Sequence, residues 1–352
     1  MMLINSQHFS VESVLEVHPD KVCDQICDAI LDSYLGFDDQ AKVAVECLGT
    51  GTSLVIGGEV FSSAEVDVEK IANQVYQEIG YQDCLSFTNL IKEQSPQLRQ
   101  PISLGAAGDQ GIMYGFACQM HENLLPLGVS LAHSIAKEID ILRKRTNQFY
   151  PDGKVQITYI GETIDTILIS VQHPPELGLK GLRALVLNEA VAKVVSLNQI
   201  RQIMVNNKST FFKGGFSNDT GLSGRKIICD TYCGLAPHGG GSFSWKDPSK
   251  IDRSGAYMAR FVAKNIVANG LSRYCLLSVA YAFGEDKPIM LSVETGEKKR
   301  DQSIRKIVLE KFDFRPSCII ERLNLKRIKF RDTSKYGHFG NEEYTWEKVF
   351  PI

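Results

Sequence analysis

The chain has 352 residues, of which 43% are hydrophobic and 23% charged, so its length suits two or three domains and its composition is that of a folded globular protein. Its 39 Lys and Arg side chains nearly balance 41 Asp and Glu side chains. The net charge of −2 excludes a general basic field for nucleic acid or an anionic membrane. No apolar run of membrane-spanning length and no signal peptide occurs, so we expect a cytoplasmic protein. The nine cysteines form no CxxC motif, and we expect them to be reduced and mostly buried.

Two β-branched runs followed by one helical pattern recur three times along the chain. The repeats lie at 42–47, 53–60 and 66–80; at 155–160, 164–173 and 180–197; and at 275–283, 289–294 and 301–312. This order favours an α+β fold of three similar βαβ-type units, with helices packed on mixed or antiparallel sheets. Polar or glycine-rich joints at 92–103 and 214–241 accompany the domain boundaries that we expect, 1–100, 105–213 and 214–352.

A histidine and an aspartate open the first expected helix, in which Pro19 suits the first turn. His18 then projects at a helix N-terminus, where the free N–H groups and the helix dipole favour anions such as phosphate. Aspartates recur at four-residue spacing along this helix, and they are Asp20, Asp24, Asp28 and Asp32. Like charges at this spacing destabilise a helix, so a divalent cation on Asp20 is one interpretation. A helix-capping Asp20 followed by a solvated acidic stripe is the other.

The densest group of charged residues and glycines lies at 218–270. Its cations are Arg225, Lys226, Lys246 and Lys250. Together with Gly239–Gly241 and a helix that Asp252 or Ser254 could cap, these cations fit a polyphosphate, and Asp252 could hold a metal ion beside it. A solvated loop is the alternative interpretation.

Two further segments carry weaker signals. The glycines of GAAGDQG, 105–111, allow close backbone approach to a ligand, although a plain turn explains them equally well. No GxxxxGK[ST] phosphate loop occurs in the chain. Asp152 and Lys154 precede an expected strand, and Phe211 precedes two glycines, where its ring could stack on a purine.

Several of these motifs resemble the S-adenosylmethionine synthetase (methionine adenosyltransferase) family and occur in that family's order. They are ESVLEVHPDK (12–21), GAAGDQGIMYG (105–115), GLSGRKII (221–228), HGGGSFS (238–244), KDPSKIDRS (246–254) and YGHFG (336–340). The resemblance implies three α+β domains related by pseudo-threefold symmetry. It also implies a homodimer with active sites between the subunits, often paired into a homotetramer.

The resemblance implies a reaction as well. The sulfur of L-methionine attacks C5′ of ATP and displaces triphosphate, which water then cleaves into pyrophosphate and phosphate. Mg²⁺, bound as a pair, and K⁺ are the implied cofactors. A departing triphosphate carries about four negative charges, and the cations of 218–270 suit its stabilisation.

Family positions give roles to individual residues. The implied catalytic residues are His18, Lys154, Arg225, Lys226 and Lys246. The ATP-binding set adds Asp152, Phe211, Asp219 and Ser242, and the methionine-binding set is Glu59, Gln94, Asp219 and Lys250. The implied metal ligands are Asp20 and Asp252 for Mg²⁺ and Glu46 for K⁺.

The chain also departs from the family pattern. Glycine is usual where Val17, Cys233 and Trp245 stand, arginine is usual at Thr210 and an acid at Gln97. The loop of thirteen residues at 95–107 is short. These departures predict altered gating, slower turnover or tolerance of larger methionine analogues. They leave two alternatives open, a weakened nucleotide-binding paralogue that acts as a regulatory subunit and a triphosphatase.

Overall fold

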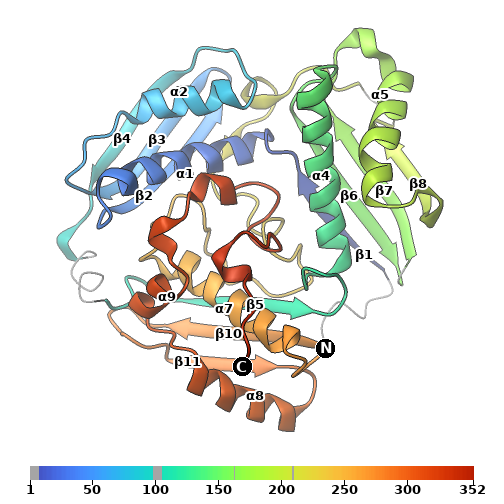
Figure 1. Cartoon of the computed structure of the whole chain (residues 1–352). Coiled ribbons are helices and arrows are strands. Elements are labelled where there is room, and N and C mark those ends of the chain that lie inside the picture. The colour runs from blue at the N-terminus through green and yellow to red at the C-terminus, as the bar shows by residue number, and fades with distance from the viewer. Residues whose placement is uncertain (1–7, 98–104, 162, 208–209) are drawn as a thin grey trace.

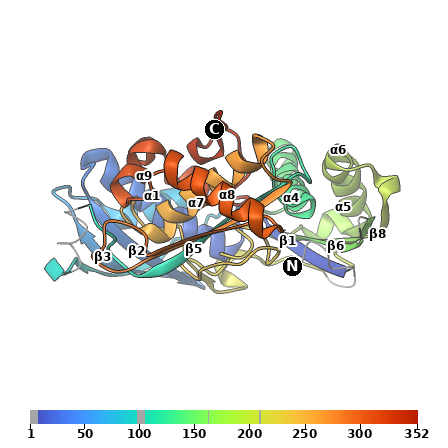
Figure 2. The same cartoon turned by 90° about the horizontal axis from the view of Figure 1, so that it is seen from below.

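The computed structural model describes residues 8–97, 105–161, 163–207 and 210–352 of the chain. Three sheets lie in one layer, and the helices gather on one side of them, as Figures 1 and 2 show together. This arrangement confirms the predicted α+β class. No helix in the described part of the chain has the length and apolar character needed to cross a membrane.

Each sheet is built around a β-hairpin. The N-terminal sheet has the order β4 (Ser86–Glu93), β3 (Ser53–Phe61), β2 (Lys42–Thr50) and β9 (Gly221–Leu222). The central sheet has the order β8 (Ile200–Val205), β7 (Thr163–Val171), β6 (Gly153–Ile160) and β1 (His8–Val14). The C-terminal sheet has the order β11 (Met290–Glu294), β10 (Tyr274–Tyr281) and β5 (Gly111–Cys118).

The three sheets share one topology and exchange strands. In each, a strand from another third of the chain pairs antiparallel with the first strand of the hairpin: β9 with β2, β1 with β6 and β5 with β10. In two of them a later strand adds in parallel to the second hairpin strand, β4 to β3 and β8 to β7. The units are therefore interleaved, and the boundaries at 100, 105, 213 and 214 stay a prediction about the chain's segments.

Each of the three sheets is covered by its own set of helices. α1 (Pro19–Phe37) and α2 (Val68–Glu78) pack at the N-terminal sheet. α4 (Leu127–Thr146), α5 (Gly178–Val186) and α6 (Ala192–Val194) pack at the central sheet, and α7 (Ile251–Ala268), α8 (Lys298–Lys311) and α9 (Pro316–Arg322) at the C-terminal sheet. In each third, a strand lent to one sheet precedes the long helix that packs on the next one (Figure 1).

Most predicted elements are confirmed, with two corrections. The helix expected at 180–197 is interrupted by a π-helical turn, Leu187–Val191, and α6 ends at Val194. The prediction that Asp252 or Ser254 caps the helix of 251–268 is wrong. Asp252 and Ser254 already lie in the first turn of α7, past the capping position. Lys250 is the N-cap residue and makes no side-chain cap, because an ammonium group cannot accept hydrogen bonds from the first N–H groups.

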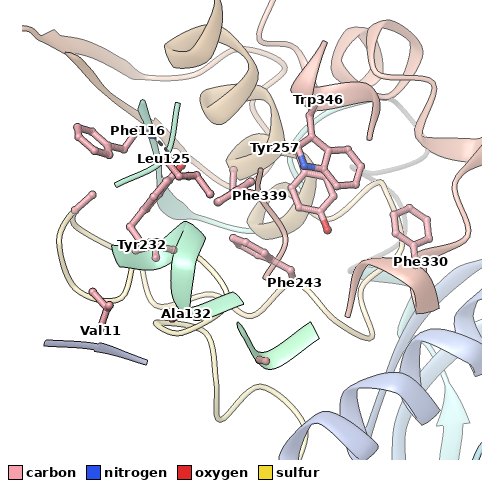
Figure 3. Close-up of a cluster of buried hydrophobic side chains, with 14 of the residues drawn as sticks. Val11, Phe116, Leu125, Ala132, Tyr232, Phe243, Tyr257, Phe330, Phe339 and Trp346 are labelled. Atoms are coloured by element: carbon pink, nitrogen blue, oxygen red, sulfur yellow. Dashed lines mark hydrogen bonds between the residues drawn. The ribbon is translucent and has the colours of Figure 1, made fainter. Parts of the chain in front are cut away.

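An aromatic cluster closes the centre of the molecule (Figure 3). The rings of Tyr257 and Trp346 stack with centroids 3.8 Å apart, and those of Tyr232 and Phe339 stack at 5.2 Å. Phe116, from the strand lent to the C-terminal sheet, meets Tyr232 edge to face. Burial of such rings contributes a large share of core stability, so this cluster holds the interleaved units together. Most of the cysteines are buried, as predicted.

Candidate active site

His18 lies at the turn between β1 and α1 and is only 2% exposed. Its Nδ1 accepts a hydrogen bond from the Asp20 N–H at 3.2 Å, which caps the helix. Burial, followed by the nearby Lys226 ammonium, lowers the pKa of His18 to about 3, so the imidazole is neutral at pH 7. Because Nδ1 accepts a bond, the ring proton resides on Nε2, which is therefore a hydrogen-bond donor.

Asp20 lies beside two consecutive cations from the C-terminal third of the chain. Its carboxylate accepts a hydrogen bond from Lys226 Nζ at 2.6 Å and lies 3.6 Å from the Arg225 guanidinium. The Leu222 N–H also donates to it, at 3.0 Å. Burial would raise the pKa of Asp20, but these hydrogen bonds hold it below its ordinary value. The interpretation of Asp20 as the helix cap is wrong, because His18 fills that role.

The acidic stripe of α1 is not solvated, which corrects the second half of that interpretation. Asp24 accepts a hydrogen bond from the Gly224 N–H at 2.9 Å, and Asp28 accepts one from the Trp245 N–H at 2.8 Å. Asp32 accepts one from the Phe330 N–H at 2.7 Å. The four-residue spacing places successive carboxylates on one helix face, and that face anchors loops of the third unit.

A cavity of about 740 Å³ opens beside His18. Five residues from the predicted sets line it, and they are His18, Asp152, Lys154, Phe211 and Asp219. Asp152 is 4% exposed, and its Oδ2 accepts a hydrogen bond from the Gly215 N–H at 3.0 Å. Burial raises its pKa to about 6. The cavity thus offers an aromatic ring, a carboxylate and an ammonium in a volume typical of small-molecule sites.

Lys213 and Asn206 also line this cavity and were missed in the sequence. Lys213 stands next to Gly214 and could have been found as a further cation of the glycine-rich joint. No sequence motif marked Asn206, which follows the end of β8 and lines the cavity only through the fold. Its amide is committed to the backbone of β7, where Oδ1 accepts from the Val171 N–H and Nδ2 donates to the Val171 carbonyl.

The remaining predicted residues lie around the N-terminal sheet. Lys246 Nζ donates a hydrogen bond to Asp252 Oδ2 at 2.5 Å. The backbone of Lys246 forms an isolated antiparallel β-bridge with Ala44 of β2. Glu46 and Glu59 lie on the face of this sheet opposite α1, because Glu59 pairs with Ala44 and Glu46 follows Ala44 by two residues. Burial raises the pKa of Glu46.

Two of the methionine-site candidates lie beside charged partners within the chain. Lys250 lies 3.4 Å from Asp247, and Glu59 lies 3.5 Å from Lys92. Gln94 is buried, and its side-chain oxygen has no hydrogen-bond partner among the described residues. A buried amide oxygen without a partner carries a desolvation cost that a bound ligand could relieve.

The predicted residues therefore form two groups. The first comprises His18, Asp20, Asp152, Lys154, Phe211, Asp219, Arg225 and Lys226. The second comprises Glu46, Glu59, Gln94, Ser242, Lys246, Lys250 and Asp252. Between described residues, no hydrogen bond or ion pair joins one group to the other. GAAGDQG borders the second group, since a Cβ on Gly111 would lie 3.6 Å from Asp252 Oδ1.

The departures from the family pattern have distinct settings. Trp245 and Cys233 have φ of 69° and 52°, so the backbone is left-handed at both, where glycine is the unstrained residue. Val17 is buried and its φ is not positive, while Thr210 lines the cavity beside His18. The short loop, 95–107, includes residues 98–104, which lie outside the described part of the chain.

Comparisons with known proteins agree along the whole chain. Family models described as the N-terminal, central and C-terminal domains of S-adenosylmethionine synthetase match residues 6–96, 104–211 and 213–348. An S-adenosylmethionine synthase of Mycoplasma capricolum subsp. capricolum is 44% identical over 99% of this chain and 96% of its own. Those of Mesoplasma florum and Treponema denticola are 42% and 41% identical, each over 97% of this chain and over 97% and 96% of their own.

The family models and the relatives thus indicate the same class of protein as the motifs do, and the interleaved α+β fold and the cations around Asp20 agree with it. The chain is a member of the S-adenosylmethionine synthetase family.

Proposed function

We propose that the chain is an ATP:L-methionine S-adenosyltransferase. The observation that carries the proposal is the cavity beside His18, in which an aromatic ring, a carboxylate and an ammonium lie next to the Arg225 and Lys226 cations. Three relatives that cover nearly the whole chain and bear the name S-adenosylmethionine synthase support it.

The geometry suits displacement at C5′ of ATP. One bond forms, from the methionine sulfur to C5′, and one breaks, from C5′ to the triphosphate oxygen, so the product is a sulfonium and free triphosphate. No covalent enzyme intermediate is needed, and the protein contributes alignment and charge. His18 would donate its Nε2–H to the leaving oxygen, and Arg225, Lys226 and Lys246 would bind the departing charge. Water then cleaves the triphosphate into pyrophosphate and phosphate.

The donor set fits magnesium bound together with phosphate. Mg²⁺ takes oxygen ligands and is usually held by one or two carboxylates plus substrate phosphates. Asp20 and Asp252 are such carboxylates, each beside a lysine that could move to a phosphate oxygen, Lys226 and Lys246. Glu46 would hold K⁺. The metal ions would neutralise the triphosphate, and the residues around them would set its position.

We further propose a homodimer, paired into a homotetramer, with each active site built from both subunits of a dimer. The lack of any hydrogen bond or ion pair between the two groups, among the described residues of one chain, supports this proposal, because a single site needs His18 and Lys246 together. Glu46 and Glu59 of the second group lie on the sheet face that α1 and α2 leave open, where a second copy could pack. Methionine would then contact Glu59, Gln94, Asp219 and Lys250.

One assay separates the candidate activities. The purified chain is incubated with ATP, Mg²⁺ and K⁺, with and without methionine, and S-adenosylmethionine and phosphate are quantified. Methionine-dependent S-adenosylmethionine supports the proposal. Nucleotide binding without turnover supports a regulatory paralogue instead, and phosphate release that ignores methionine supports a triphosphatase.

A further inference from the structure

We infer that Trp245 is a positioning residue that fixes two loops of triphosphate-binding cations, each loop serving one of the two active sites of the proposed homodimer, an inference that rests on the proposed function. One loop, 223–226, carries Arg225 and Lys226. The other, 242–246, carries Ser242 and Lys246. The indole ring of Trp245 lies between these loops.

The contacts of the ring define its place. Trp245 is 8% exposed, and its benzo edge lies against Gly224: a Cβ built on Gly224 would be 2.5 Å from Trp245 Cη2. The same Cβ would be 2.9 Å from Ser242 Oγ, so Ser242 also borders this contact. Real Cβ atoms do not approach so closely, and the ring therefore rests directly on the Gly224 backbone. The two loops can come no nearer while the indole is present.

The backbone on both sides of this contact is fixed from α1. Asp24 accepts the Gly224 N–H at 2.9 Å and Asp28 accepts the Trp245 N–H at 2.8 Å, so consecutive turns of one helix hold the two loops. Asp28 is itself fixed by Arg253 Nη2, 2.8 Å away, and both side chains are completely buried. A rigid helix thus sets the anchor points, and the indole fills the distance between them.

The conformation of Trp245 gives a second reason to assign it a role. Its φ of 69° is strained for a bulky side chain by about 1 kcal/mol or more. Such strain persists where the surroundings over-determine the conformation, and here the Asp28 hydrogen bond and the Gly224 contact do so. Lys246 follows directly, with its Nζ 5.4 Å from the indole centroid, so a shift of the ring would move this ammonium.

Trp245→Gly and Trp245→Phe test the inference as a pair. Glycine keeps the N–H for Asp28 and suits the left-handed backbone but removes the ring, whereas phenylalanine keeps a ring. We expect Trp245→Gly to weaken binding of Mg²⁺-tripolyphosphate and to lower kcat/KM for ATP by roughly 10- to 100-fold, as expected for misplaced binding groups. Trp245→Phe should restore both to within about 3-fold of the wild type.

A size exchange with Gly224 provides the control for the contact. Gly224→Ala places a methyl group into the indole and should weaken tripolyphosphate binding on its own. In the Trp245→Gly background the clash with the indole is gone and only the Ser242 hydroxyl, which can rotate, lies near the methyl group. The strain of the left-handed position is the same, so we expect the effect of Gly224→Ala to be much smaller there. Independent effects of the two substitutions would contradict the inference.

Binding is measured by calorimetry and folding by the melting temperature, so the results separate from the catalytic assay. A Trp245→Gly protein that melts earlier yet binds tripolyphosphate as the wild type does would show a purely structural tryptophan and overturn the inference. Wild-type binding of tripolyphosphate without formation of S-adenosylmethionine would instead count against the proposed function, and the comparison of variants would still decide the role of Trp245.

Discussion

The two groups of site residues differ in how the fold builds them. Five of the eight members of the first group line a cavity, and the group draws on all three thirds of the chain, as with His18, Lys154 and Lys226. The second group is spread over an open sheet face and the segment 242–252 that borders it. The strand exchange accounts for the first group, because it brings the ends of distant segments together.

The largest expected effect tests whether the two groups act in one site. His18→Asn and Lys246→Met should each lower kcat by roughly 10²- to 10³-fold, because each removes a donor or charge aimed at the departing triphosphate. Co-expression of the two variants should yield hybrid dimers in which one of two sites has both residues intact. If subunits pair at random, activity returns to about one quarter of the wild type.

A matched histidine serves as the control. His121 lies in the turn after β5 and bonds to Asn123 outside the cavity lining, so His121→Asn should retain wild-type activity. Two inactive variants that stay inactive when co-expressed would place both groups in the same subunit's site. That result would remove the reason for a shared active site while leaving the proposed reaction intact.

The buried ion pair of Asp28 with Arg253 supports the loop that carries Lys246 of the second group, and its loss should have the next largest effect. Asp28→Ala leaves the Arg253 guanidinium buried without its partner, which should lower the free energy of unfolding by about 3–5 kcal/mol. Urea denaturation measures this change. Asp39→Ala removes an exposed carboxylate 3.3 Å from Lys326, and its denaturation midpoint should stay near that of the wild type. Equal midpoints for both variants would show that the ion pair does not support this loop.

The stability of the structure that supports His18 of the first group should depend on pH through Asp140. Asp140 of α4 accepts a hydrogen bond from the Glu16 N–H at 3.0 Å, just before His18, and another from the Tyr336 hydroxyl at 2.8 Å. Burial, followed by the nearby Glu16 carboxylate, raises its pKa from 3.8 to about 7. The folded state therefore binds this proton more tightly than the unfolded chain does. The stabilisation is complete below about pH 4 and is lost as the pH rises through 7.

Asp140→Asn removes this dependence. We expect the urea midpoint of the wild type to fall, relative to that of Asp140→Asn, between pH 5 and pH 8. Glu138→Gln alters a carboxylate on the same helix that pairs with Lys193 at the surface, and its midpoint should run parallel to that of the wild type. Parallel curves for Asp140→Asn as well would mean that Asp140 is ionised in the folded state.

The sequence was informative about elements and motifs but not about their partners. Hydrophobic periodicity located the hairpins, and the order of two strands and a helix indicated three similar units. It could not reveal the strand exchange, because β1, β5 and β9 pair with segments far away in the chain. Local patterns record which face of a strand is buried, not which strand lies beside it.

The candidate site shows the same limit. Residue types and motifs identified His18, Asp20 and the cations, whereas the roles of Asp24 and Asp28 depend on N–H groups about two hundred residues away. Spacing alone made these carboxylates look solvated, since an acidic stripe on a helix usually faces water. Their burial became visible only when the loops of 223–226 and 242–246 were placed against α1.

The smallest expected effect separates conformational strain from function. Cys233 shares the left-handed backbone of Trp245, with φ of 52°, but its thiol makes weak Sγ–H contacts, to the Glu12 carbonyl at 3.1 Å and to the Cys229 carbonyl at 3.8 Å. Cys233→Gly should therefore raise the free energy of unfolding by up to about 1 kcal/mol, because glycine carries no left-handed penalty. Cys233→Ala loses the sulfur and keeps the strain, so it should not stabilise the fold. Urea denaturation of both variants measures the difference, and an alanine variant more stable than the glycine variant would mean that this backbone is not left-handed. Kinetic constants should stay unchanged in both, since no ring at Cys233 separates the cation loops as Trp245 does.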